Sequence, residues 1–248
     1  MYRLFTVFIL LLALAGLTGC GPKDSDDPTA DWTAEEFYRE ARAELEDGNY
    51  LTAIEYYETL ESRFPFGKYA MQAQIDVAYA YFKFEELDSA ITALDRFIKL
   101  HPRHPAVDYA YYMKGVVNFE RGGNILDLVS ERDVSEFDRN LMLRSYNDFK
   151  VLLQRFPDSK YATDARNRMI YLRNELAQAD YTVAKYYASR KAWVAVTGRT
   201  RFILLNYQGT DIVRPTLELQ LQAYQELGLD KLANDTQRII DLNFGEQS

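Results

Sequence analysis

The chain has 248 residues, a net charge of −8 and a single Cys, with 19 Tyr and 14 Phe but only 12 Gly and 7 Pro. The acidic balance argues against a nucleic-acid partner, because binding to phosphates requires a basic surface. One Cys excludes an internal disulfide and a Cys-based zinc site. The scarcity of Gly and Pro is typical of a helical protein with little irregular backbone.

Residues 1–19 predict a secretory signal peptide, because Arg3 precedes an apolar run from 4 to 14 that is short for a membrane span. Leu17-Thr18-Gly19-Cys20 resembles the bacterial lipobox. We therefore expect Cys20 to be the mature N-terminus and to carry an N-acyl and an S-diacylglycerol group. Several acyl chains hold a protein stably at a membrane where one does not. The alternative is a free thiol at the end of a signal anchor.

The residue after Cys20 predicts the destination. An Asp there would retain an enterobacterial lipoprotein in the inner membrane, and this chain has Gly21 instead. We expect the outer membrane, with the protein on its periplasmic face. Residues 20–32 are polar, acidic and interrupted by Pro, so they predict a flexible tether between the lipid and the folded part.

Three later segments share one spacing of residue types. A small residue (Ala53, Ala90 or Ser145) is followed by a large apolar residue four positions on, by another after three more, and by Pro after five more. This is the spacing of the second helix of a tetratricopeptide (TPR) unit. The small residue lets the partner helix approach, the apolar pair faces it, and Pro ends the helix. The predicted fold is all-α, an α-solenoid of five TPR helix pairs.

The helix pairs follow one another along the chain. The first begins at a capping box, with Thr33 as N-cap and Glu36 three residues later. The fifth pair is degenerate, as expected of a unit that caps a stack. Residues 33–160 form units one to three in this division, and residues 161–248 form units four and five. The expected helices lie at about 33–47 and 50–63, 69–84 and 87–100, 106–121 and 141–155, 161–190 and 192–206, and within 213–243.

The third unit is interrupted by an insertion at about 124–139, after Gly122-Gly123. Insertions in repeat arrays map to loops on one face, often the binding face. The alternative is a tolerated surface loop with no role in binding.

The sequence contains no motif of a nucleophile elbow, a phosphate-binding loop or a zinc protease. Its two His residues are His101 and His104. His101 aligns with Phe64 and Phe156, so we expect it to fill a structural position at a helix end. We therefore predict no catalytic residue, no metal site and no cofactor other than the lipid on Cys20.

The concave face of a TPR stack is lined by positions 2, 5, 9 and 12 of each first helix. In the first three units these positions are unusually aromatic. Rings beside Arg42 and Lys83 suit an extended peptide with apolar side chains and a terminal carboxylate. The alternative is that the rings pack against the next helix. The candidate peptide groove consists of Tyr38, Arg42, Tyr79, Phe82, Tyr109 and Tyr112.

Several longer phrases are more specific than the TPR spacing. They include Arg-Phe-Pro-Phe-Gly at 63–67, Asp-Tyr-Ala-Tyr-Tyr-Met-Lys-Gly at 108–115 and Ala-Trp-Val-Ala-Val at 192–196. Together with the lipobox and the repeats, they resemble the BamD family of TPR lipoproteins of the β-barrel assembly machinery. The resemblance extends over essentially the whole chain.

The resemblance implies a non-enzymatic adaptor at the outer membrane. Its C-terminal repeats would dock the last POTRA domain of the barrel subunit BamA, and its N-terminal repeats would receive targeting signals of unfolded outer-membrane proteins. BamC would contact the N-terminal half and BamE the C-terminal part. The family's BamA contact includes an Arg shortly after the phrase at 192–196, a position that Arg199 takes here, with Arg201 two residues later. The BamA-facing set implied is Arg199, Arg201, Tyr187 and Lys185.

Two other functions are compatible with a TPR lipoprotein. One is a pilotin that escorts a secretin to the outer membrane, which predicts the loss of one secretion or pilus system when it is removed. The other is a scaffold for peptidoglycan enzymes, which predicts co-purification with them.

Overall fold

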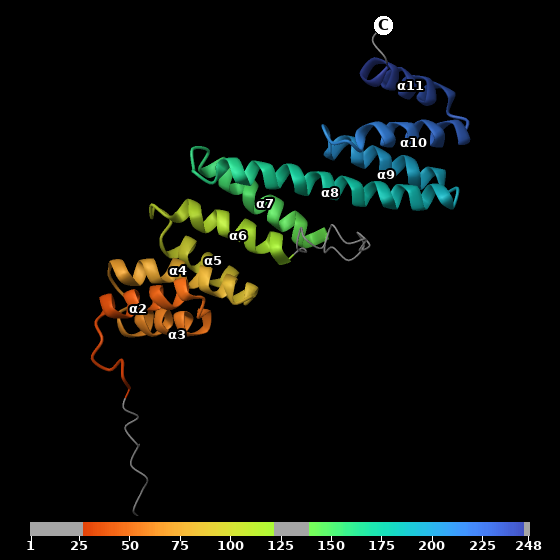
Figure 1. Ribbon diagram of the computed structural model, residues 1–248. Coiled ribbons are helices and arrows are strands. Elements are labelled where there is room, and N and C mark those ends of the chain that lie inside the picture. The colour runs from red at the N-terminus through yellow and green to blue at the C-terminus, as the bar shows by residue number, and fades with distance from the viewer. Residues whose placement is uncertain (1–26, 122–138, 246–248) are drawn as a thin grey trace, which may run out of the picture.

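The computed structural model describes residues 27–121 and 139–245, and within these ranges it consists of helices and their connections (Figure 1). The all-α prediction is confirmed. The signal peptide, Cys20, most of the tether and the insertion up to residue 138 lie outside the described residues. The helices are α2 (Ala34–Asp47), α3 (Tyr50–Arg63), α4 (Lys68–Lys83), α5 (Leu87–Leu100), α6 (Val107–Arg121), α7 (Arg139–Arg155), α8 (Ala162–Ser189), α9 (Trp193–Asn206), α10 (Val213–Glu226) and α11 (Asp230–Phe244).

The helices form successive pairs that stack from α2 and α3 at one end to α10 and α11 at the other (Figure 1). Each helix packs against the next one in the chain. The predicted helix positions agree with the structure to within about two residues, a margin usual for helix ends. α8 has 28 residues, twice the length of α9. None of the described helices is both long and apolar enough to span a bilayer.

The repeated spacing marks the contact between the two helices of a pair. All nine small and apolar residues of the three copies are buried, with exposed fractions of at most 1%. In α9 the corresponding positions are also buried, although their residue types had not revealed the pattern. The nine are Ala53, Tyr57, Leu60, Ala90, Leu94, Phe97, Ser145, Phe149 and Leu152, and the α9 set is Val196, Thr200 and Ile203.

Both local predictions about helix ends are confirmed. Thr33 and Glu36 form the capping box, with the Thr33 N–H 2.8 Å from Glu36 Oε2 and the Glu36 N–H 3.3 Å from Thr33 Oγ1. His101 follows the last residue of α5, and its backbone N–H donates to the Phe97 carbonyl at 2.8 Å. Its ring lies 5.2 Å from that of Phe97, and Nε2 is 2.8 Å from Gln74 Oε1. The imidazole therefore fills the structural position that Phe occupies in neighbouring units.

Gly115 permits the closest approach between paired helices. A Cβ at this position would lie 2.5 Å from Cε1 of Phe149, a separation that no packed structure tolerates. The Ser145 hydroxyl, in the small position of α7, donates to the Gly115 carbonyl at 2.9 Å. The contact between α6 and α7 therefore depends on small residues on both helices.

We predict opposite effects for two Gly→Ala substitutions in helices. Gly115→Ala overpacks the α6–α7 contact and should lower the unfolding free energy by about 1–3 kcal/mol. Gly198→Ala, in α9, adds a Cβ to open space and should raise it by about 0.5–1 kcal/mol, because Ala favours the helix. Urea unfolding followed by circular dichroism measures both. Equal stability of the two variants would contradict the close approach.

Candidate functional site

A cavity of about 410 Å³ opens on the N-terminal half, between α2, α3, α4 and α6. Three of the six predicted groove residues line it, namely Arg42, Tyr79 and Tyr109. Its volume lies in the range of small-ligand sites, large enough for one or two side chains of a peptide. The full lining is Arg42, Leu45, Glu46, Tyr50, Asp76, Tyr79, Lys83 and Tyr109.

A partly buried carboxylate, Asp76, organises the wall of this cavity. Tyr38 donates its hydroxyl to Asp76 Oδ2 at 2.9 Å, and Gln72 Nε2 donates to Oδ1 at 3.0 Å. Burial raises the pKa of Asp76, although both hydrogen bonds oppose the shift. Burial and the nearby Asp76 charge raise the pKa of Tyr38 as well. Tyr38 therefore belongs to the cavity through Asp76, which sequence reasoning missed.

Beside this network lies a buried hydroxyl with no partner. Tyr57 is 1% exposed, and its hydroxyl makes no hydrogen bond. Its ring is 6.1 Å from that of Tyr38, and burial followed by the Asp76 charge raises its pKa. Buried polar atoms are rarely left unpaired, so this hydroxyl is an exception in the packing beside the cavity.

Two basic and two acidic side chains line the cavity, and they differ in whether they already have an ionic partner. Arg42 Nε is 3.0 Å from Glu46 Oε1, an exposed pair of the kind that contributes little and exchanges readily. Lys83 has no ion pair with any described residue, and its ammonium lies 5.8 Å from the Tyr50 ring centroid. Lys83 is therefore a cation at the rim that a ligand carboxylate can approach.

The remaining two predicted groove residues lie beyond the cavity lining. Phe82 is adjacent, with its ring 6.4 Å from that of Tyr79. Tyr112 stacks on Tyr161 at 4.7 Å and donates to Asp164 Oδ2 at 2.7 Å, so it packs between α6 and α8. Tyr161 also lies 5.4 Å from Tyr109 and connects Tyr112 to the cavity. The alternative that some rings pack against the next helix holds for Tyr112.

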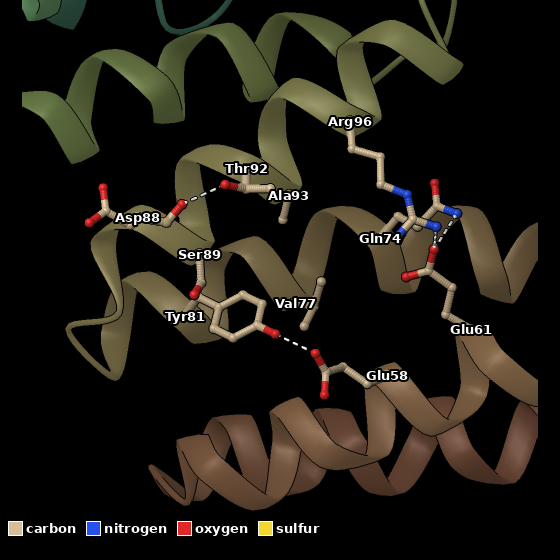
Figure 2. Close-up of a pocket in the computed structure, with 10 residues that line it drawn as sticks. All are labelled: Glu58, Glu61, Gln74, Val77, Tyr81, Asp88, Ser89, Thr92, Ala93 and Arg96. Atoms are coloured by element: carbon tan, nitrogen blue, oxygen red, sulfur yellow. Dashed lines mark hydrogen bonds and ion pairs between the residues drawn. The ribbon is translucent and has the colours of Figure 1, made fainter.

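A second cleft of about 330 Å³ lies between α3, α4 and α5 (Figure 2). Several of its charged side chains form hydrogen bonds or ion pairs with other residues that line the cleft. The Tyr81 hydroxyl donates to Glu58, and Glu61 receives both Arg96 and the Gln74 amide (Figure 2). Because these groups are already paired, the cleft offers a charged ligand less than the first cavity does. Among the described residues no cluster of His, Cys, Asp and Glu has the arrangement of a metal site.

In the C-terminal half, a buried carboxylate joins three helices. Asp180 of α8 is 2% exposed, and its Oδ1 accepts from Arg139 Nη1 at 3.0 Å and from Arg199 Nη1 at 2.9 Å. The Tyr207 hydroxyl donates to Oδ2 at 2.9 Å. Burial, with the Asp180 hydrogen bond and charge, raises the pKa of Tyr207 to about 12. Two guanidinium groups share one carboxylate, which leaves a local excess of positive charge.

The predicted BamA-facing residues therefore differ in their surroundings. Arg199 is one-third exposed and already holds Asp180, whereas Arg201 is exposed and forms no ion pair or hydrogen bond within the described part of the chain. Lys185 and Tyr187 lie further along α8, with the Lys185 ammonium 5.2 Å from the Tyr181 ring. Sequence reasoning missed Asp180. The one sequence feature that could have revealed it is its position among apolar residues on the buried face of α8.

The outer surface of α9 is apolar. Val194 is 73% exposed and Leu205 is 65% exposed, and both share a helix face with Gly198 and Arg201 by their spacing. Nothing lies within 4 Å of a Cβ built on Gly198, so the middle of this face is flat and open. Contiguous exposed apolar residues with one charge are typical of a protein-binding surface. We call Val194, Gly198, Arg201 and Leu205 the α9 face.

Known proteins resemble this chain over most of its length. Residues 30–239 match the YfiO family, described as "Outer membrane lipoprotein". A Neisseria meningitidis serogroup A protein is 42% identical over 98% of this chain and 92% of its own length. A Vibrio cholerae protein is 40% identical over 94% and 96%, and a Haemophilus influenzae protein 36% identical over 95% and 89%. All three are described as "Outer membrane protein assembly factor BamD". The chain therefore belongs to the YfiO family of outer membrane lipoproteins, the family of the assembly factor BamD.

Proposed function

We propose that this protein is a lipid-anchored, non-catalytic adaptor for the assembly of outer-membrane proteins. The lipid on Cys20 holds it at the periplasmic face of the outer membrane. The N-terminal cavity receives a terminal segment of an unfolded outer-membrane protein, and the C-terminal repeats dock the POTRA domain of BamA. Confinement to the membrane raises the effective concentration of the adaptor near its partner.

The cavity around Asp76 is the observation that carries the substrate-binding part. Aromatic walls from Tyr79 and Tyr109 suit an aromatic or aliphatic side chain. Lys83, which has no ion pair with any described residue, suits a terminal carboxylate. An extended segment that ends in an apolar side chain and a carboxylate satisfies all of these groups together.

The α9 face supports the docking part. An apolar surface with a flat centre at Gly198 lets a partner approach closely, and Arg201 supplies an unpaired cation at its edge. Arg199 lies nearby, with its guanidinium held in place by Asp180. An arginine that is already positioned loses less conformational entropy when it also receives a partner's carboxylate. BamC and BamE are further candidate partners, for the N-terminal and C-terminal halves respectively.

Photo-crosslinking from α4 tests the substrate site. A photoreactive residue at Tyr79 should capture nascent outer-membrane proteins, because its side chain lines the cavity. The matched control places the photoreactive residue at Tyr81, two positions further along α4. Tyr81 lines the cleft of Figure 2 instead of the cavity, so this variant should capture few outer-membrane proteins. Capture is measured as the yield of substrate-containing adducts after immunoprecipitation. Equal yields at the two positions would remove the cavity from the substrate path.

The role of Lys83 predicts a preference for a free carboxylate. A peptide with the C-terminal sequence of an outer-membrane protein should bind more tightly than its C-terminally amidated form. We expect the dissociation constant of the amidated peptide to be about threefold to tenfold higher. The effect is smaller than the loss of a buried charged hydrogen bond would cause, because Lys83 is exposed. Lys83→Gln should abolish the difference, whereas Lys150→Gln, an exposed lysine on α7, should preserve it. Fluorescence anisotropy measures all three, and a preference that persists in Lys83→Gln contradicts the assignment.

Docking is tested by neutral substitutions at the two arginines and at the carboxylate between them. Arg199→Gln and Arg201→Gln should each reduce co-purification with BamA by removing a cation from the interface. Asp180→Asn retains the shape of the side chain but releases Arg199, so it should reduce BamA recovery while the helical content by circular dichroism is unchanged. Combining Asp180→Asn with Arg199→Gln should then cost little more than Arg199→Gln alone.

Unchanged BamA recovery in all three single variants would show that the interface lies elsewhere on the protein.

Mass spectrometry of proteins that co-purify with the lipidated wild type distinguishes the adaptor from the two other functions. A pilotin recovers a secretin, and a peptidoglycan scaffold recovers cell-wall enzymes.

A further inference from the structure

The most exposed large apolar side chain of the described residues is Phe66, at 90%. It lies in the connection between α3 and α4, within the phrase Arg-Phe-Pro-Phe-Gly. Neither the cavity on the concave face nor the α9 face includes it. A Phe this exposed gains almost nothing from burial on folding, so its ring is available for a contact outside the chain.

The loop holds Phe66 outward in a defined position. Phe64 ends α3 and turns inward, where its ring lies 6.4 Å from that of Phe37. Pro65 restricts the backbone next to it. Gly67 has a φ of 107°, a conformation that favours glycine, and α4 begins at the following residue. With both neighbours constrained, Phe66 protrudes from a short and rigid connection.

The N-terminal segment joins the fold beside this loop. Arg63, the last residue of α3, donates to Asp27 Oδ2 at 2.5 Å and to the Thr29 carbonyl at 2.8 Å. Hydrogen bonds from Thr29, with that from Arg63, lower the pKa of Asp27 to about 2, so the pair stays charged at neutral pH. The Trp32 ring packs 5.1 Å from Phe37. Figure 1 shows this segment leading to the start of α2 at one end of the stack.

The length of chain before Asp27 brings this loop close to the membrane. Asp27 follows Cys20 by seven positions, a stretch of chain that spans at most about 25 Å when fully extended. Phe66 follows Arg63 by three residues, so it lies within about a further 10 Å along the chain. This step rests on the proposed lipid on Cys20, which places that residue at the bilayer surface.

We propose that Phe66 inserts into the interface of the membrane that holds the Cys20 lipid. The lipid and Phe66 then form two contacts on one side of the first unit. A lipid alone restrains position but allows rotation, whereas a second contact sets the orientation of the unit. The concave cavity consequently faces a fixed direction relative to the bilayer.

The cysteine content makes the proposal testable in the full-length protein. Cys20 is the only Cys, and the lipid occupies its sulfur, so Lys68→Cys introduces a single free thiol beside Phe66. An environment-sensitive fluorophore on this thiol is read in vesicles that contain spin-labelled lipid as a quencher. The same label at Leu242→Cys, 77% exposed on α11 at the other end of the stack, is the control position.

We expect the label at position 68 to be quenched at least about twofold more than the label at position 242. Adding Phe66→Ser should lower quenching at position 68 to the level of the control. Because Phe66 is exposed, this substitution leaves the core intact. Leu51→Ser, an exposed apolar side chain at the opposite end of α3, should leave quenching at position 68 unchanged.

Flotation of the same vesicles separates failure of the lipid anchor from failure of the proposal. Protein that does not float overturns both the anchor and the membrane contact of Phe66. Protein that floats, but whose label at position 68 is quenched no more than the control, overturns the contact alone. Quenching that Phe66→Ser does not reduce also overturns it, because another residue then brings the loop to the bilayer.

Discussion

The close approach of paired helices is the constraint on which the rest of the structure depends. In α3, α5 and α7 a small side chain packs against the partner helix, and between α6 and α7 Gly115 also lies against Phe149 and Ser145. The cavity beside Asp76 and the exposed α9 face both lie outside these contacts.

Acidic residues within helices lie beside both of the proposed binding surfaces. Asp76 and Asp180 both occupy positions that a purely structural helix would fill with an apolar residue. Each holds hydroxyl or guanidinium groups at a surface, Tyr38 in one case and Arg199 in the other. A buried carboxylate with several donors costs desolvation energy but orients its partners, which suits a recognition surface. The same arrangement thus appears in both halves of the chain.

Much of the fold was predictable from the sequence because its signals are local. Three kinds of signal act within one or two turns: the capping box at Thr33, the spacing in α3, α5 and α7, and the aromatic or His residue that follows each of these helices. The candidate site was less predictable. Position along a first helix indicated Arg42, Tyr79 and Tyr109, which line the cavity, but it also indicated Tyr112, whose ring packs on Tyr161, 49 residues away in the sequence.

The sequence by itself determined the class of the protein, the register of its helices and the expectation of a lipid on Cys20, because each depends on residues close together in the chain. Only the tertiary structure decided which charges are free. Arg199 is paired with Asp180, while Lys83 and Arg201 have no ionic partner within the described residues. Pairing depends on distances between helices, and helical spacing within one segment does not contain those distances.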